Sequence, residues 1–287
     1  MQSSLKSFKK SPFQSVKHSN YFDVYDLLFK DLIGKEIVFV EIGILDGGSL
    51  FMWQDFFGKN AKIIGIDFNP EAKKWENYGF DIYIGDQSDE NFWKSTLDKI
   101  GNINVLLDDG GHTYEQQIVT VESALKNIVD GGLLVVEDTH TSYMKDFGGP
   151  SFFSFISYAK NKIDKSNYRF SLFINNKDYE KNIYSISFYE SFVVFNINRK
   201  LCSNKSKLVT NLGEKIVAKD FRDKSSRLLT YINEKLYLIK HHKLNEDINL
   251  ITKIYYKFIR TILKIVLKVS GIIRRLNFSL RHINYFF

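Results

Sequence analysis

The sequence predicts an α/β fold built on a doubly wound parallel sheet that is covered by helices on both faces. Five short runs rich in β-branched residues read as buried strands, and most of them are bounded by Gly, Asp or Asn. Segments of helical length separate these runs, and this alternation implies parallel strands joined by crossovers. The predicted strands span residues 36–42, 62–67, 80–84, 103–108 and 132–137.

The segments between the strands are predicted as helices. In one of them, Ile118, Val121 and Leu125 share a single stripe at helical spacing, as expected for a helix that packs on a sheet. The predicted helices span residues 49–57, 70–77, 88–98, 114–128 and about 151–163.

Two further strands are predicted at 183–189 and 192–198. They are separated only by the turn at Tyr189-Glu190-Ser191, and so short a connection permits only an antiparallel hairpin. Five parallel strands with a terminal hairpin therefore form the predicted sheet. The chain divides into an N-terminal segment with a helix (1–35), the α/β domain (36–200), a polar, partly helical linker (201–248) and a C-terminal extension (249–287).

The formal net charge of +7 comes from the C-terminal extension. From Asn249 onward there are eight Lys or Arg residues and no acid, which leaves 32 basic against 33 acidic residues before it. Basic and apolar residues recur there at helical spacing, which predicts a basic amphipathic helix. Its apolar face contains Ile251, Ile254, Tyr255, Phe258, Ile262, Ile265, Val266 and Val269, beside Lys253, Lys257, Arg260, Lys264 and Lys268.

Two roles for this basic helix remain open. It packs on the body of the protein or on another subunit, or it attaches the chain peripherally to anionic lipid. A nucleic-acid role is disfavoured, because no recognisable reading motif accompanies the helix and the rest of the chain is nearly neutral. We also expect a homo-oligomer.

Composition excludes several other classes. Cys202 is the only cysteine, so an internal disulfide and a thiolate metal cluster are excluded. The first twenty residues lack the apolar core of a secretion signal, and no uncharged run approaches the length of a membrane span. We therefore expect a cytoplasmic protein, which the basic helix would place peripherally at the inner face of a membrane.

The first predicted strand ends in a glycine-rich turn that predicts a ligand site. Small residues such as Gly43 and Gly47 let the backbone approach a ligand, and a helix start follows directly. Asp67 ends the second strand, where an acid can accept both hydroxyls of a ribose. These features fit a nucleotide, NAD or S-adenosylmethionine, and the turn alone is weak because it also suits a simple strand-to-helix connection.

Two further acids favour S-adenosylmethionine. Asp86 follows the third strand, where it could receive an adenine amino group, although it could also cap the helix that begins near Ser88 or Asp89. Glu41 precedes the glycine turn and could face the cationic end of the cofactor. An acid at that place would repel the diphosphate of NAD.

Two pairs of acids end the fourth and fifth strands. Asp108 and Asp109 precede His112, and Glu137 and Asp138 precede His140. In a doubly wound sheet these strand ends are neighbours, and ligands bind outside the carboxyl ends. Four carboxylates in one cleft would repel one another, so we expect either a compensating cation or several protonated groups there. A divalent cation fits best, with Mg²⁺ favoured and Mn²⁺ or Ca²⁺ as substitutes, and the neighbouring histidines leave a transition metal open. The alternative is that the acids cap separate helices, and a lysine between them would contradict the metal site.

The histidines near these acids are candidates for catalysis. His112 follows Asp109 on the loop, and histidine is a common general base in enzymes, so it is the candidate general base. His140, Thr141 and Tyr143 follow the second pair of acids. They are candidates for substrate contact or for shaping the loop.

At these residues the sequence resembles the metal-dependent sugar O-methyltransferases of macrolide and surface-glycan pathways, a family similar to the cephalosporin-hydroxylase and novobiocin-type methyltransferases. The resemblance covers about residues 17–198. It is carried by YFDVYDLLF (21–29), VEIGILDGGSLFMW (40–53), IIGIDFNP (63–70), GDQSD (85–89), LLDDGGH (106–112), GGLLVVEDTHTSY (131–143) and SISFYESFVVF (185–195). It implies a Rossmann-like class I methyltransferase domain.

The resemblance also implies roles for individual residues. The implied Mg²⁺ ligands are Asp109, Glu137 and Asp138, and the implied base is His112. Glu41, Gly43, Asp67 and Asp86 are implied to hold S-adenosylmethionine, and we assign Gly47 and Asp108 to the same cofactor site. The family commonly has Ser where Gly111 stands here, and some members carry an extra N-terminal domain where this chain has a C-terminal extension.

These observations predict an enzyme that transfers a methyl group from S-adenosylmethionine to a sugar hydroxyl, with Mg²⁺ holding the acceptor. The expected acceptor is a sugar, a nucleotide sugar or a glycan of surface polysaccharide biosynthesis. Two alternatives stay open. One is an NAD-dependent oxidoreductase acting on a nucleotide sugar, and the other is a non-catalytic scaffold attached to a membrane.

Overall fold

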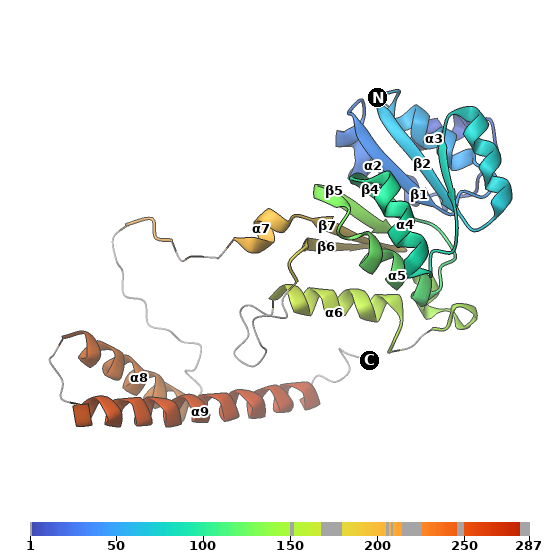
Figure 1. Cartoon of the computed structure of the whole chain (residues 1–287). Coiled ribbons are helices and arrows are strands. Elements are labelled where there is room, and N and C mark those ends of the chain that lie inside the picture. Colours follow the sequence, from blue (N-terminus) through green and yellow to red (C-terminus); the bar gives the residue numbers. More distant parts are fainter. Residues whose placement is uncertain are drawn as a thin grey trace. The chain divides into compact units, whose positions relative to one another are not determined.

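The computed structural model describes residues 2–149, 152–167, 180–204, 207, 209–213, 226–245 and 250–281. It divides into two compact units, Met1–Lys207 and Leu208–Phe287, and Figure 1 draws both. The division falls inside the predicted linker.

The first unit contains the predicted sheet. Its seven strands lie in the order β3-β2-β1-β4-β5-β7-β6, with the first five strands of the chain parallel and β7 antiparallel to β5 and β6 (Figure 1). The doubly wound sheet with a terminal hairpin is therefore confirmed. The strands are β1 (Ile37–Ile42), β2 (Ala61–Asp67), β3 (Asp81–Ile84), β4 (Ile103–Asp108), β5 (Ile128–Val136), β6 (Ile183–Tyr189) and β7 (Phe192–Ile197).

The predicted helices are present with small changes at their ends. The helix predicted at 114–128 ends at Ala124, because Ile128 already pairs with Ile103 in the sheet. The segment predicted at 70–77 is a 3₁₀ helix, Pro70–Tyr78. The α-helices of the unit are α1 (Ser4–Lys10), α2 (Tyr21–Phe29), α3 (Gly48–Phe57), α4 (Glu90–Ile100), α5 (Tyr114–Ala124), α6 (Phe155–Asn167) and α7 (Arg199–Ser203).

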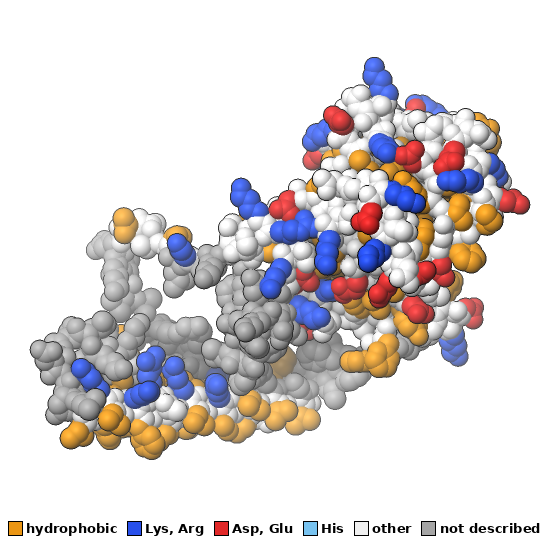
Figure 2. Space-filling view, in the orientation of Figure 1, with side chains coloured by type: hydrophobic (Ala, Val, Ile, Leu, Met, Phe, Trp, Pro, Cys, Tyr) orange, Lys and Arg blue, Asp and Glu red, His pale blue; other side chains and the backbone are white. Residues whose placement is uncertain are grey.

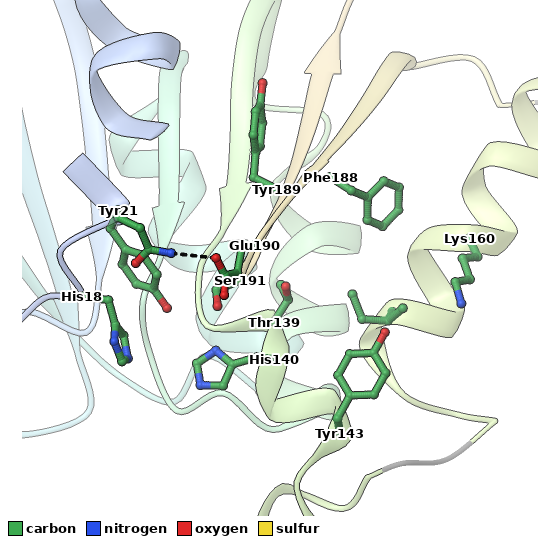
Figure 3. A pocket seen from close by; sticks show the side chains of 12 residues that line it. His18, Tyr21, Thr139, His140, Tyr143, Lys160, Phe188, Tyr189, Glu190 and Ser191 are labelled. Carbon is green, nitrogen blue, oxygen red and sulfur yellow. Dashed lines mark hydrogen bonds between the residues drawn. The ribbon is translucent and has the colours of Figure 1, made fainter. Parts of the chain in front are cut away.

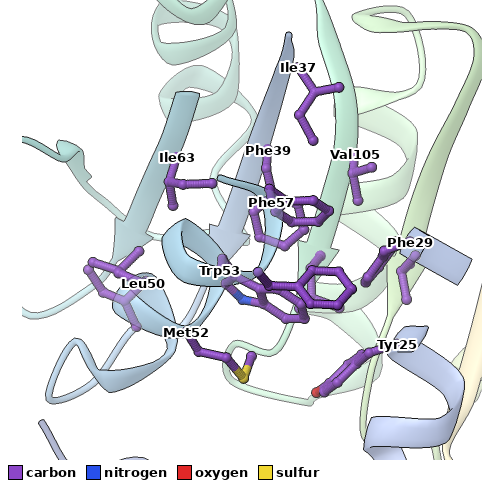
Figure 4. Packing of buried hydrophobic residues seen from close by; sticks show 14 of the residues in the cluster. Tyr25, Phe29, Ile37, Phe39, Leu50, Met52, Trp53, Phe57, Ile63 and Val105 are labelled. Atoms are coloured by element: carbon purple, nitrogen blue, oxygen red, sulfur yellow. The ribbon is translucent and has the colours of Figure 1, made fainter. Parts of the chain in front are cut away.

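The two faces of the sheet are packed differently. Beneath α2 and α3, an aromatic cluster joins the helices to β1, and Figure 4 shows Tyr25, Phe29, Trp53 and Phe57 around Phe39. Each is 0% exposed, and burying one large apolar side chain contributes roughly 2–3 kcal/mol. The opposite face is covered by α4, α5 and α6 through mainly aliphatic contacts, to which Trp93 of α4 and Phe155 of α6 add aromatic rings. The sheet edge that carries the predicted site is thus held on a rigid support.

The second unit contains two long helices, α8 (Arg227–Asn245) and α9 (Leu250–Arg281), which pack against each other. The basic amphipathic helix predicted from Asn249 onward is thus a helix over the residues that the structure describes. Residues 282–287 of the predicted extension lie outside them. Within the described ranges, no helix combines the length and the apolar character needed to cross a bilayer.

Candidate active site

Strand register brings the predicted site residues to one edge of the sheet. Ile42 of β1 pairs with Asp108 of β4, and Asp108 pairs with Val136 of β5. The residues that follow each strand therefore leave the sheet side by side. This confirms that both acid pairs and the glycine turn share one edge.

Glycine is required at both predicted positions, Gly43 and Gly47, because neighbouring atoms lie too close to leave room for a side chain. Gly43 has a φ of +83°, and a Cβ there would lie 2.1 Å from the carbonyl oxygen of Asp109. Gly47 has a φ of +76°, and a Cβ there would lie 2.3 Å from the ring of Trp75. Glycine adopts a left-handed backbone conformation at little cost and has no Cβ, so it meets both requirements. The turn is thus packed against the acid-bearing loop after β4.

Asp67 holds the glycine turn in place. One carboxylate oxygen accepts the backbone N–H groups of Ile44 at 3.0 Å and Leu45 at 3.1 Å, and the other accepts that of Asn69 at 2.8 Å. The side chain is half-buried, and a carboxylate has room for further acceptor bonds. Asp67 therefore shapes the turn and remains available to a ribose.

Asp86 does not cap the following helix. Asp89 is the N-cap residue of α4 and accepts the N–H of Asn91. Asp86 instead accepts the backbone N–H and the hydroxyl of Ser88, at 2.8 and 2.7 Å, and it stays half-buried. The capping alternative is therefore wrong, and the predicted role toward adenine stays a prediction.

Glu41 differs from its predicted position. It is 0% exposed, and its two oxygens accept the hydroxyl of Ser49 at 2.7 Å and the indole N–H of Trp53 at 3.1 Å. The side chain thus faces α3 inside the protein, and direct contact with a cofactor is not what this structure shows. The physical reason is that α3 offers two donors to the strand end.

Burial of Glu41 predicts a pH-dependent stability. Burial raises the pKa of this carboxyl from 4.5 to about 7, although Lys17 and Ser49 oppose the shift. A raised pKa means that the folded state favours the protonated form of Glu41. The contribution of this group to the unfolding free energy is therefore fully present below the pKa of the unfolded chain, and it is lost as pH rises through about 7. The metal-free protein should lose up to about 3 kcal/mol of unfolding free energy between about pH 5 and 8 from this group.

Chemical denaturation at several pH values checks this prediction. Glu41→Gln should reduce the pH dependence, because the amide does not ionise, and the remaining dependence comes from Asp108 and Glu137, whose pKa values are also raised. Glu90→Gln, an exposed acid at the start of α4, is the matched control and should follow the unmodified protein. If the unfolding free energies of the two variants depended equally on pH, the assignment of this pH dependence to Glu41 would be wrong.

Asp108 is also buried, with 1% exposure. One oxygen accepts the side-chain amide of Gln87 at 2.9 Å and the N–H of Gly110 at 3.2 Å. The other oxygen has no hydrogen-bond partner, and burial raises the pKa of this carboxyl to about 7. A buried carboxylate oxygen without a partner is a place where a bound ligand could donate a hydrogen bond.

A lysine that the sequence analysis did not predict lies among the acids. The ammonium of Lys17 donates to Asp109 and, at 3.1 Å, to Glu137, and the lysine side chain is only 3% exposed. Burial alone would lower the pKa of Lys17, but the carboxylates of Asp109 and Glu137 raise it well above its ordinary value. Lys17 is therefore charged, and it bridges the two acid pairs.

The N-terminal segment brings Lys17 to this edge. Ser11 donates its hydroxyl to the carbonyl oxygen of Gly48 at 2.8 Å, so the chain crosses the start of α3 before it reaches the acids. A Cβ on Gly48 would lie 2.5 Å from the carbonyl oxygen of Phe13. We call residues 11–18 the strap. It runs from the glycine turn to the acid cluster.

Two tyrosines of α2 also bind the acid pair after β5. Tyr21 donates its hydroxyl to Asp138, and Tyr25 donates to Glu137 at 2.6 Å. Glu137 is 1% exposed, so both of its oxygens are satisfied inside the protein by Tyr25 and Lys17. Burial and the charge of Asp109 raise the pKa of Glu137 to about 8.

The structure brings together a metal-ligand set that differs from the predicted one. Asp109, His112 and Asp138 each offer a ligand atom, and these atoms lie within 4.8 Å of one another. Glu137 belongs to neither group of this kind in the described part of the chain, because it is turned toward Lys17 and Tyr25. The predicted set of three carboxylates is thus not assembled around one point here.

His112 and Asp138 are held in unusual backbone conformations. Their φ values are +60° and +56°, which non-glycine residues adopt rarely and mostly where function or packing demands it. The imidazole Nε2 lies 3.5 Å from an oxygen of Asp138, and Nδ1 is buried without a hydrogen-bond partner. Thr141 donates its hydroxyl to the carbonyl oxygens of Asp138 and His112, so Thr141 shapes the loop.

The presence of glycine at position 111 also has a structural explanation. The side chain of Gln116 closes a capping box with Thr113 at the start of α5, and a Cβ on Gly111 would lie 2.2 Å from it. A serine at this place, as in the resembling family, would require Gln116 to move. The loop that carries His112 is therefore held by the helix cap.

A cavity of about 580 Å³ opens beside these residues. The two predicted substrate residues, His140 and Tyr143, both line it, and Figure 3 shows His18 facing His140 across from Tyr143 and Lys160. His18, Asp138 and His140 form a second group of close metal-ligand atoms. The full lining is His18, Asn20, Tyr21, Thr139, His140, Tyr143, Ile156, Lys160, Phe188, Tyr189, Glu190 and Ser191.

A second cavity of about 470 Å³ lies beside the glycine turn. Trp75, whose indole N–H has no hydrogen-bond partner, contributes to its wall together with Phe13 of the strap and Asp46 of the turn.

Four residues of the site were not predicted from the sequence: Lys17, Tyr21, Tyr25 and Trp75. The spacing of the two tyrosines on one face of a helix was a usable signal, whereas Lys17 stands in no local pattern.

Comparison with known proteins agrees with this geometry. Residues 40–139 match the family model described as a methyltransferase domain. This part of the chain is similar to methyltransferase domains. It contains the glycine turn, Asp67, Asp86 and both acid pairs.

Similar curated proteins are O-methyltransferases. Demethylmacrocin O-methyltransferase of Streptomyces fradiae is 31% identical over 134 residues, which covers 44% of this chain and 33% of the relative. Mycinamicin VI 2''-O-methyltransferase of Micromonospora griseorubida is 30% identical over 132 residues, which covers 44% and 33%. The chain thus spans about a third of the length of these relatives.

A solved structure resembles the domain in its fold. The MycE methyltransferase in complex with Mg, SAH and mycinamycin VI superimposes with a TM-score of 0.59 at 24% identity, over 68% of this chain and 52% of that one. The likeness establishes the fold alone.

Proposed function

We propose that the protein is an S-adenosylmethionine-dependent and divalent-metal-dependent O-methyltransferase that acts on a sugar hydroxyl. The observation that carries this proposal is the convergence of Asp109, His112 and Asp138 at the sheet edge beside the glycine turn of a methyltransferase domain. A relative from Streptomyces olivaceus, 8-demethyl-8-alpha-L-rhamnosyl tetracenomycin-C 2'-O-methyltransferase, has a rhamnosyl group in its name, and this supports the sugar acceptor.

The cofactor would lie over the glycine turn. Gly43 and Gly47 let it approach the backbone, and Asp67 and Asp86 stand where ribose and adenine can be bound. The unpartnered oxygen of Asp108 adds an acceptor on the same side. S-adenosylmethionine supplies an electrophilic methyl group when it is bound.

The lysine that was expected to contradict the metal site is present, because Lys17 lies between Asp109 and Glu137. Asp138 instead lies beside the imidazoles of His112 and His140, and its carboxylate and that of Asp109 still offer oxygen ligands close together, which fits a divalent cation. Asp109 and Asp138 would hold the ion with oxygen ligands, which Mg²⁺ prefers, and Glu137 would join them if it left Lys17. A bound Mg²⁺ would fix an acceptor hydroxyl and increase its acidity.

The residues of the chain supply the remaining chemistry. His112 accepts the proton of the hydroxyl while the oxygen forms a bond to the methyl carbon and the carbon–sulfur bond breaks. Asp138 lies 3.5 Å from the His112 imidazole, where its charge stabilises the protonated ring. The products are a methyl ether and S-adenosylhomocysteine.

The 580 Å³ cavity is the proposed acceptor site. Tyr143, Phe188 and Tyr189 offer aromatic surface to the C–H face of a sugar, and Glu190 and Lys160 offer polar contacts. We propose a sugar of surface polysaccharide or glycoconjugate biosynthesis as the acceptor. A homo-oligomer and a cytoplasmic location stay predictions.

Mass spectrometry tests the proposed reaction. The protein is incubated with S-adenosylmethionine, Mg²⁺ and a panel of nucleotide sugars and lipid-linked glycans, and one acceptor should gain a single methyl group. Excess chelator should stop the reaction, and turnover that persists in chelator would contradict the metal. Calorimetric titration with S-adenosylhomocysteine and with NAD distinguishes the methyltransferase from the oxidoreductase alternative. Binding of NAD without binding of S-adenosylhomocysteine would favour the oxidoreductase.

A further inference from the structure

The second unit carries a long apolar surface that the proposed reaction does not use. Helix α9 is 32 residues long, and its apolar side chains recur at intervals of three and four residues, which places them in one stripe. We call this set the α9 stripe. Its members are between 43% and 79% exposed: Ile251, Ile254, Tyr255, Phe258, Ile262, Ile265, Val269, Ile272, Ile273, Leu276 and Leu280.

The contact with α8 does not cover this stripe. The partly buried positions of α9, such as Tyr256, Ile259, Leu263 and Val266, follow a separate line of three- and four-residue steps. That line is the expected contact face for α8, which packs against α9. Figure 2 shows the hydrophobic side chains in a continuous row along one edge of α9, with Lys and Arg above them. Among the described residues of its own unit, the stripe therefore remains open.

The charge of the unit decides which surface fits the stripe. α9 carries eight Lys or Arg residues and no acid. α8 adds four basic residues and only one acid, Glu234. A surface that matches this unit must offer both hydrocarbon and negative charge along the length of the helix.

A second copy of the helix does not offer that match. Helices that pair through apolar stripes use opposite charges beside the stripe, and α9 has no acid to place against the lysines of a partner. Pairing would bring cationic helices together. Burial of α9 as a membrane span is also unfavourable, because basic residues recur along its whole length.

We infer that α9 binds in the plane of a membrane surface that contains anionic lipid. The α9 stripe enters the boundary between headgroups and acyl chains, and Lys253, Lys257, Arg260 and Lys264 stay among the lipid phosphates. This inference does not depend on the proposed reaction. It would place the methyltransferase domain close to lipid-linked acceptors.

Vesicle flotation of the full chain tests this inference. Vesicles of phosphatidylcholine alone are compared with vesicles that contain about one third phosphatidylglycerol. The protein should float with the anionic vesicles at least about tenfold more than with the neutral ones, and high salt should reduce the difference. Equal flotation with both kinds of vesicle would overturn the role of charge.

Matched variants test the two parts of the surface. Ile254→Gln/Ile262→Gln/Ile265→Gln removes the centre of the stripe and should abolish flotation at any salt concentration. Lys253→Gln/Lys257→Gln/Lys264→Gln should remove the preference for anionic lipid. Thr261→Gln, an exposed position beside the stripe, should behave as the unmodified chain.

Circular dichroism verifies that each variant keeps its helices, and light scattering reports the oligomeric state. Wild-type flotation of the stripe variant would overturn the inference. So would an oligomer that dissociates in the stripe variant while the unmodified chain ignores both kinds of vesicle, because the stripe would then be a contact between copies. Loss of methyl transfer without loss of flotation would concern only the proposed function.

Discussion

Replacing Asp109 by Ala is expected to reduce methyl transfer by at least about a thousandfold while cofactor binding stays intact. Asp109 belongs to the group of ligand atoms within 4.8 Å and also faces Lys17, so its removal takes away a metal ligand next to the proposed base. The glycine turn and Asp67 are untouched by the change. Steady-state kinetics with the identified acceptor and calorimetry with S-adenosylhomocysteine measure the two effects.

Asp98→Ala provides the control, because Asp98 is exposed on α4 away from the sheet edge. It should keep the activity of the unmodified protein. Turnover of Asp109→Ala within about tenfold of the control would show that the acid cluster does not act in catalysis.

Replacing Lys17 by Met is expected to have opposite effects on the metal-free and metal-bound protein. The ammonium is the buried partner of Asp109 and Glu137, so its loss leaves two buried acids without their counter-charge. Removing one partner from a buried ion pair costs about 3 kcal/mol, and we expect this decrease in the unfolding free energy without metal. Mg²⁺ should bind the variant at least about tenfold more tightly, because the ion no longer competes with the lysine.

Calorimetric titration with Mg²⁺ and thermal melts with and without the ion measure both effects. Lys10→Met is the matched control, since Lys10 is 59% exposed and pairs with Asp55 at the surface. Weaker Mg²⁺ binding by Lys17→Met would show that the lysine supports the ion instead of competing with it. Absence of Mg²⁺ binding in all three proteins would remove the metal from the proposed function.

The strands could be predicted because each lies in a short apolar run. A parallel strand buried on both faces must be apolar throughout, so runs such as IVFVEI and INVLLD are visible without a partner. Helix ends were less certain. Ile128 continues the apolar stripe of α5 in the sequence, but its pairing with Ile103 places it in β5.

The candidate site was predicted in part. Acids at the ends of β4 and β5 had to meet, because parallel neighbours end at the same edge, and the register confirms it. The direction of each side chain was not predictable. Glu41 and Glu137 turn inward because Ser49 with Trp53 and Tyr25 with Lys17 offer donors there.

The sequence alone determined the parallel sheet with its terminal hairpin and the edge at which the acids gather. It also determined that every charged residue of α9 is basic. These features were predictable because hydrophobic periodicity and the order of charges are local properties of the chain. Tertiary structure alone decided that Lys17 lies between Asp109 and Glu137 and that Glu137 points away from His112. These contacts join residues 92 and 120 positions apart, and the free energy of burying a charge depends on neighbours that only the folded chain brings together.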